Sequence, residues 1–246
     1  MPDATRPARR QPHPAAALLL LLLLGTVCAV LPARGADRPF VLTASAAAEE
    51  DDDHVWAVES WWSRAGSQRS LSVAPSYGFN PTDSVQFEFS RSRDRSAGER
   101  ADGLEIEFKH LFNRIGRDGW GWGVDIALAL GNANRGAWQH QGLTVKLPWT
   151  LQLRDGGAAL HVNAGLSKAR GERREWVGSA AYEHELPGRI TGFVEVGRED
   201  RQTLLHGGVR HWLKRDKFAV DFSVQQLRSG GSSERGVVIG FGWYDL

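Results

Sequence analysis

The sequence predicts an all-β protein, a closed antiparallel up-and-down transmembrane β-barrel of about twelve strands, with ten to fourteen compatible with the pattern. Three observations indicate this fold class. Apolar residues alternate with polar or small ones along most of the chain, and no segment after residue 37 longer than about ten residues has helical periodicity. Turn residues separate the alternating segments. Tryptophan and tyrosine recur near the segment ends, as in interfacial girdles.

Residues 1–36 have the features of a signal peptide. Arg9 and Arg10 precede an apolar run over 15–31, and the small residues that follow Pro32 offer cleavage sites close to Asp37. An uncleaved transmembrane anchor is the alternative, because the run approaches the length of a span. Proline and small residues directly after the run favour cleavage. We therefore expect an exported protein, and for a barrel the outer membrane.

Charge and cysteine content exclude several classes of function. The 246 residues contain 30 Lys and Arg against 29 Asp and Glu, and those after residue 36 contain 26 basic and 28 acidic side chains. Nucleic acid is not an expected partner, since binding phosphates needs clustered positive charge. Cys28 and Met1 are the sole sulfur-containing residues. The mature chain therefore has no disulfide, cysteine-based metal site or cysteine nucleophile, and we expect neither a cofactor nor a metal.

Residues 37–53 form an acidic N-terminal lead-in before the barrel, which covers 54–246. Its acidic patch is either a solvated segment, since like charges resist burial, or a cation-gathering patch or small plug at the periplasmic mouth. The spacing lacks the glycine and distal glutamate of a calcium loop. The patch consists of Glu49, Glu50, Asp51, Asp52 and Asp53.

Period-two alternation defines the strands. Val85–Phe89 and Leu104–Lys109 alternate cleanly, and from Trp120 to Leu130 every second residue is large and apolar. Pro148 lies within the sixth segment and predicts a bend or a break there. The twelve predicted strands cover 54–62, 69–78, 83–92, 103–113, 119–131, 137–153, 157–167, 174–185, 189–197, 203–213, 217–227 and 236–245.

The connections predict two different barrel ends. Odd-numbered connections, such as 93–102 and 228–235, are longer and charged, whereas most even-numbered ones are short turns such as Asn80-Pro81 and Pro187-Gly188. Long loops at one end and tight turns at the other are typical of outer-membrane barrels. An even strand count returns both termini to the same end.

Alternation alone leaves open which face is buried, because a soluble sandwich or lipocalin-like barrel alternates too. Glycine, alanine, serine and isolated charges on the polar face favour a crowded, hydrated lumen with the apolar face toward lipid. Aromatic residues near strand ends favour the same orientation. They are Trp56, Trp61, Trp62, Tyr77, Trp120, Trp138, Trp149, Trp176, Trp212, Trp243 and Tyr244.

Three short stretches resemble a known group of proteins: Arg38-Pro39-Phe40-Val41, Leu104–Phe112, and Gly119-Trp120-Gly121-Trp122-Gly123. They are similar to small, largely uncharacterised outer-membrane β-barrels of Gram-negative bacteria, some of them transporter-like. The resemblance implies outer-membrane lipids and the barrel assembly machinery as partners. The terminal Leu246 departs from the phenylalanine that commonly ends such chains.

The predicted lumen-lining residues are mostly acidic. If the barrel is closed, each charge must be hydrated or paired, since burial of a lone charge is costly. Two interpretations stay open: a narrow hydrated path that favours cations, or carboxylates paired with basic residues that fill the lumen. The candidates are Glu59, Glu88, Glu105, Glu107, Lys109, Asp125, His161, Glu195, Arg210 and Asp221.

Passive passage of small solutes is the function that these features favour. A barrel enzyme acting on lipid or lipopolysaccharide would need serine, histidine and an acid together, and the histidines are scattered singly. His184, between Glu183 and Glu185 and beside Tyr182, comes nearest to such a group. A third class is a structural or surface-interaction barrel, with segments 92–102 and 228–235 contacting partners or lipid phosphates.

Overall fold

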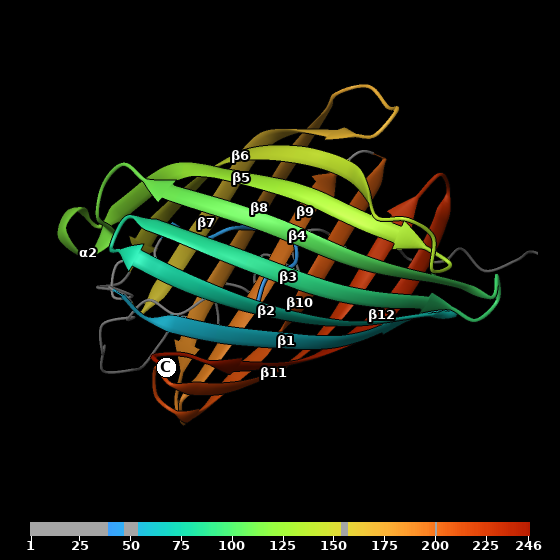
Figure 1. Cartoon of the computed structure of the whole chain (residues 1–246). Helices are drawn as coiled ribbons and strands as arrows, with labels where there is room; N and C mark the ends of the chain where they lie inside the picture. Colours follow the sequence, from blue (N-terminus) through green and yellow to red (C-terminus); the bar gives the residue numbers. More distant parts are fainter. Residues whose placement is uncertain (1–38, 47–53, 154–156, 200) are drawn as a thin grey trace, which may run out of the picture.

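A computed structural model describes residues 39–46, 54–153, 157–199 and 201–246, and its strands form one closed antiparallel barrel (Figure 1). Each strand pairs with its neighbours in sequence, and the first pairs with the last to close the sheet. The predicted fold class is confirmed. The predicted signal peptide at 1–36 and the acidic patch at 49–53 lie outside the described residues.

Twelve strands make up the barrel. Their bounds are β1 Trp56–Ala65, β2 Gln68–Asn80, β3 Asp83–Asp94, β4 Glu99–Leu111, β5 Trp120–Ala133, β6 Gln139–Leu153, β7 Ala158–Ala169, β8 Glu175–Leu186, β9 Ile190–Glu199, β10 Gln202–Lys214, β11 Phe218–Ser229 and β12 Ser232–Trp243. Each overlaps one of the predicted strands. One short helix, α2 (Ile115–Asp118), joins β4 to β5. No described helix has the length and apolar character needed to cross a membrane.

The sixth strand remains continuous through Pro148, so of the bend or break predicted there, the break is wrong. Pairing of β6 with β5 passes from Trp149 directly to Lys146, which leaves Pro148 outside the hydrogen-bonded pairs on that side. On its other side Pro148 lies opposite Asn163 of β7. The proline lacks an N–H to donate, and the strand tolerates it where the pairing with β5 is interrupted.

The expectation of long loops at one end is also wrong. Residues 54 and 246 lie at the same end of the barrel, here called the terminal end; the opposite end is the distal end. Fully described distal connections contain at most five residues, at 134–138 and 170–174, because the strands continue into the charged segments. The longest described connection, 112–119 with α2, is at the terminal end.

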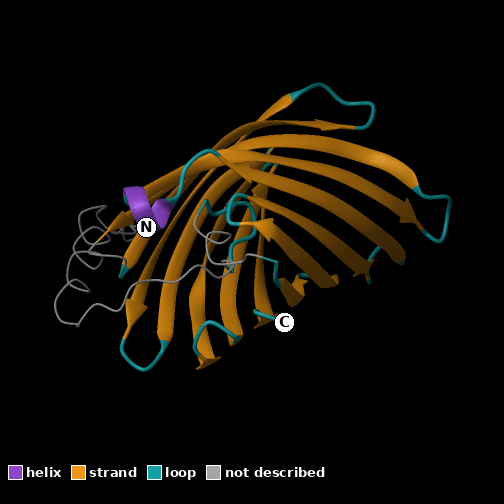
Figure 2. Cartoon of the chain, turned by 60° about the vertical axis from the view of Figure 1, so that its left-hand side comes forward, coloured by secondary structure: helices purple, strands orange, loops and turns teal. Residues whose placement is uncertain are grey.

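Burial is inverted relative to a soluble protein, and this confirms the predicted orientation. Phe89, Leu205 and Phe222 are 52, 56 and 55% exposed on the outer face, whereas Asp125 and His161 are both 0% exposed in the interior. Figure 2 shows the tilted strands turning around this enclosed interior. An apolar outer wall and a polar interior are the arrangement of a membrane-spanning barrel.

The aromatic residues divide between the two faces. Trp56, Trp120 and Trp243 are exposed outside at the terminal end, and Trp138 and Trp176 at the distal end. Three residues predicted for the girdles instead face inward, because their strand positions have the opposite parity: Trp61 lines the lumen, and Trp212 packs with Tyr244 in a buried cluster near the terminal end.

Candidate functional site

The described part of the N-terminal lead-in, residues 39–46, runs through the lumen (Figure 1). Glu195 of β9 holds it: the carboxylate accepts hydrogen bonds from the backbone N–H groups of Val41, Leu42 and Thr43, at 2.9, 2.8 and 2.8 Å. Backbone amides taken out of water need acceptors. The carbonyl oxygens of the strands already accept hydrogen bonds within the sheet, so inward side chains must supply the acceptors for residues 39–46.

Two further inward side chains bind the segment. Asn163 of β7 accepts from the N–H of Ala44 at 2.7 Å and donates to its carbonyl oxygen at 3.0 Å. Thr150 of β6 accepts from the N–H of Ala46 at 2.9 Å. The segment therefore crosses the interior along β9, β7 and β6 in turn, fixed by polar groups on each strand.

Apolar contacts hold the first residues of the segment, Phe40 and Leu42, against the barrel wall. The ring of Phe40 packs against His161 and Phe193, with centroids 5.2 and 5.7 Å apart. A Cβ atom on Gly197 of β9 would lie 2.9 Å from Leu42 Cδ1 and 3.0 Å from Ser179 Cβ, so the absence of a side chain at Gly197 lets Leu42 pack closely against the wall. The wall of the barrel is thus shaped to receive residues 39–46.

Behind Glu195 lies a buried hydrogen-bond relay. His206 Nδ1 is 3.0 Å from Glu195 Oε2, and His206 Nε2 is 2.8 Å from Ser223 Oγ. The order serine, histidine, carboxylate is that of a hydrolase triad. However, Ser223 is 3% exposed and does not line a described cavity, and Glu195 is engaged by three amides. We assign the relay to orienting Glu195.

A second buried network narrows the terminal half of the lumen. Arg210 of β10 donates two hydrogen bonds to Asp221, at 2.7 and 2.8 Å, and one to Glu59 at 3.2 Å. Tyr244 donates to the same Glu59, and the guanidinium lies 5.5 Å from the rings of Tyr244 and Trp212. These groups are buried, and their charges are compensated within the network.

Lys146 and His161 each have two polar neighbours among the other inward side chains. Lys146 Nζ is 3.7 Å from Asp125 and 3.9 Å from Glu107. His161 is 2.9 Å from the hydroxyl of Thr150 and 3.6 Å from Glu183. Pairing of carboxylates with bases, one of the two interpretations left open by the sequence, therefore describes much of the lumen.

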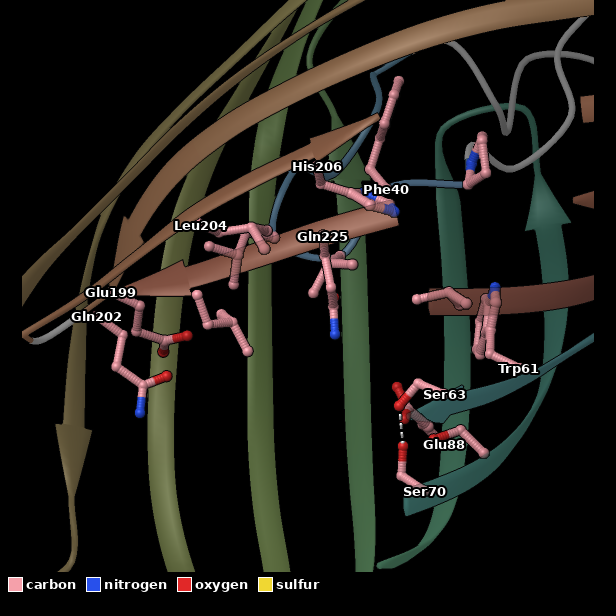
Figure 3. Close-up of a pocket in the computed structure, with 16 residues that line it drawn as sticks. Phe40, Trp61, Ser63, Ser70, Glu88, Glu199, Gln202, Leu204, His206 and Gln225 are labelled. Carbon is pink, nitrogen blue, oxygen red and sulfur yellow. Dashed lines mark hydrogen bonds between the residues drawn. The ribbon is translucent and has the colours of Figure 1, made fainter. Parts of the chain in front are cut away.

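Two cavities adjoin the N-terminal segment. The distal one has a volume of about 370 Å³ and lies between residues 39–42 and a wall that includes Ser63, Glu88, Glu199 and His206 (Figure 3). The second, of about 130 Å³, lies along residues 40–45. Both share Phe40, Val41, Leu42, Trp61 and Glu88 in their walls, so the segment separates two spaces within one lumen.

The smaller cavity is acidic. Its wall carries Glu59, Glu88, Glu105 and Glu107 against Lys109 and Lys146. Glu88 and Glu105 face each other directly across β3 and β4, and neither forms an ion pair with a described residue. Two carboxylates in this position repel one another, which favours a cation between or beside them. Even so, the described residues hold no group of three or more histidine and acidic side chains arranged for a metal ion.

The structure places all ten predicted lumen residues on inward-facing strand positions. Six of them fall into three groups, two of which include a residue that was not predicted: Arg210 with Asp221 and Glu59; Asp125 and Glu107 with Lys146; and Glu195 with His206. Glu88, Glu105 and Lys109 line the smaller cavity, and His161 contacts Thr150 and Glu183. Sequence analysis missed the lumenal position of residues 39–46 and the partnership of His206 with Ser223. Segment 39–46 has no alternation that would mark it as part of the sheet. His206 and Ser223 lie on neighbouring strands, β10 and β11, and come together only through the pairing of these strands.

A family model described as "Uncharacterised conserved protein UCP029691" matches residues 31–240. The chain belongs to this family. The match confirms the predicted resemblance to a largely uncharacterised barrel family. A comparison with curated proteins found no match.

Solved structures with the same fold include two porins. The structure titled "KdgM porin" is 8% identical with a TM-score of 0.58, covering 76% of this chain and 98% of its own. The NanC porin is 10% identical with a TM-score of 0.53, covering 78% of this chain and 100% of its own. At these identities the likeness shows that this chain of family UCP029691 shares their barrel fold.

Proposed function

We propose that this protein is an outer-membrane channel for passive passage of small solutes, with residues 39–46 as a plug inside its lumen. The observation that carries the proposal is that this plug lies between two cavities of the same lumen and is held by side chains rather than by the sheet. Such a segment can leave without breaking strand pairing, so the two cavities can join into one path.

The shared fold with two porins and the apolar outer wall support the location in the outer membrane. The terminal half of the lumen stays narrow, since Arg210, Trp212 and Tyr244 fill it beside β1 and β11. Small hydrated solutes therefore fit this path better than extended oligomers.

Cations are the favoured solutes. The four carboxylates of the smaller cavity outnumber its two lysines, and Glu88 and Glu105 stand opposite one another at its wall. In a water-filled constriction, rings of carboxylates attract cations and repel anions. The paired charges near Arg210 hold the wall together and contribute less to selectivity.

Conductance in planar lipid bilayers tests the proposal. The refolded mature chain should give small or rare conductance steps in KCl, and deletion of residues 39–46 should give larger, persistent steps. Under a KCl gradient the reversal potential should indicate a preference for K⁺. The double substitution Glu88→Gln with Glu105→Gln should reduce that preference, whereas Glu99→Gln, a carboxylate at the distal tip, should not.

A silent barrel after deletion of the plug would contradict the channel proposal, provided that the deleted protein still folds. Folding is checked on a denaturing gel, where a closed barrel that has not been heated migrates differently from the heat-unfolded chain. A preference for Cl⁻ in the variant without residues 39–46 would contradict the proposal that the carboxylates of the smaller cavity select cations. It would not contradict the proposal that the protein is a channel.

A further inference from the structure

Four arginines follow one another across the outer face of neighbouring strands at the distal end. The register places Arg64 of β1 opposite Arg69 of β2, Arg69 opposite Arg93 of β3, and Arg93 opposite Arg100 of β4. Side chains opposite one another in antiparallel strands are about 5 Å apart at Cβ, and like charges there destabilise the sheet. A row of four cations therefore calls for bound anions.

The carboxylates close to this arginine row have other partners. Asp102 binds Arg91 at 2.6 Å. Asp94 accepts hydrogen bonds from the amide and hydroxyl of Ser96 in its own turn and from the hydroxyl of Ser67 in the β1–β2 turn. Glu99 lies opposite Asp94 at the tip of the β3–β4 hairpin, beyond the row. The row thus retains net positive charge toward the outside of the barrel.

The arginine row lies directly beyond the apolar outer wall. Along β2 the outward residues are Val73, then the 52% exposed Leu71, then Arg69. Along β3 they are Phe89, then Arg91, which pairs with Asp102, then Arg93. At about 3.4 Å per residue, Arg69 is about 7 Å farther along the strand than Leu71. With the apolar wall in lipid chains, the arginines reach the level of the headgroups.

An outer groove leads up to the same site. It has a volume of about 980 Å³, and a row of outward positions crosses it from β9 to β1: Val194, Gly207, Val224, Val237 and Arg64. Gly207 supplies no side chain, which leaves the depression between its apolar neighbours. Arg235 of β12 also lines the groove near Arg64. An apolar groove that ends at two arginines is complementary to a hydrocarbon chain with an anionic headgroup.

We propose that Arg64, Arg69, Arg93, Arg100 and Arg235 bind the phosphates of a bis-phosphorylated glycolipid of the lipid A type, and that one of its acyl chains lies in the outer groove. The row spans three strand spacings, about 14 Å, which suits two separated phosphomonoesters better than a single phosphodiester. This site rests on the membrane location proposed above, and it is independent of solute passage through the lumen.

Native mass spectrometry of the refolded chain with diphosphoryl lipid A in detergent tests the site. The double substitution Arg69→Gln with Arg93→Gln should weaken binding about 30-fold, from roughly fivefold per arginine at a membrane surface. Gly207→Leu, which fills the groove, should also weaken it. Matched controls are Arg173→Gln with Arg174→Gln, two exposed arginines in the distal connection between β7 and β8, and Gly178→Leu, an outward glycine of β8; both variants should bind normally.

Thermal unfolding without lipid separates binding from folding. Because Arg69→Gln with Arg93→Gln relieves repulsion, the lipid-free variant should be at least as stable as the parent. Equal lipid A affinity in this variant and in the Arg173/Arg174 control would overturn the site. Phosphatidylglycerol bound as tightly as lipid A would overturn the choice of a bis-phosphorylated glycolipid.

Discussion

Arg210 and Asp221 face each other across β10 and β11 inside the barrel, and two hydrogen bonds of 2.7 and 2.8 Å join them. Both side chains are 2% exposed. The bidentate geometry fits a guanidinium to a carboxylate with both partners desolvated. Glu59 brings β1 into the same network, so this pair helps to join the last strands to the first one.

Removal of one partner leaves a buried charge without compensation. We expect Asp221→Ala to lower the free energy of unfolding by about 3–5 kcal/mol. Asp102→Ala, which breaks the exposed pair with Arg91, should change it little. Urea titration of the protein in lipid vesicles, followed by tryptophan fluorescence, compares them. Equal losses for both variants would show that the buried network is not the stabilising feature.

Glu195 is the main anchor of residues 39–46, so its charge should control their release. In Glu195→Gln the side chain keeps its shape but loses the negative charge that three amides share. Hydrogen exchange at Val41, Leu42 and Thr43 should become at least tenfold faster, because hydrogen bonds to charged groups are the stronger ones. Glu185→Gln, a carboxylate bound to Arg215 away from the plug, is the control and should leave these rates unchanged.

Ser223 should be unreactive. A fluorophosphonate probe labels serine only where a base activates it and the reagent has access, and Ser223 is enclosed. We expect no labelling of the folded chain, measured by mass spectrometry of its peptides, while a serine hydrolase in the same sample is labelled. Labelling that disappears in Ser223→Ala and His206→Ala would instead identify the relay as an enzyme site.

Substitutions at two glycines of the sheet distinguish the effect of steric crowding from that of reduced backbone flexibility. A Cβ on Gly165 of β7 would overlap the carbonyl of Val145, whereas one on Gly178 of β8 meets nothing closer than 3.8 Å. Gly165→Ala should therefore cost about 1–3 kcal/mol and lower the yield of folded barrel, and Gly178→Ala should not. The folded fraction on unheated gels measures both. Similar yields would mean that β6 and β7 can move apart freely.

The amino-acid order by itself determined the barrel, its strands and its orientation. Period-two alternation depends on local geometry, since each side chain of a strand points opposite to its neighbour. For this reason the inward positions of Asp125, His161 and Glu195 followed once the apolar face was assigned to lipid. The break predicted at Pro148 was wrong because the tolerance for a proline depends on whether the adjoining strand needs its N–H at that point, which pairing decides.

Tertiary structure alone decided what occupies the lumen and which charges meet. Segment 39–46 carries no periodicity, and its place comes from acceptors on β6, β7 and β9, up to 154 residues away in sequence. The arginine row has the same origin: Arg64, Arg69, Arg93 and Arg100 become neighbours only through strand register. Side-chain alternation is fixed within a strand, whereas partners across strands depend on how the whole sheet closes.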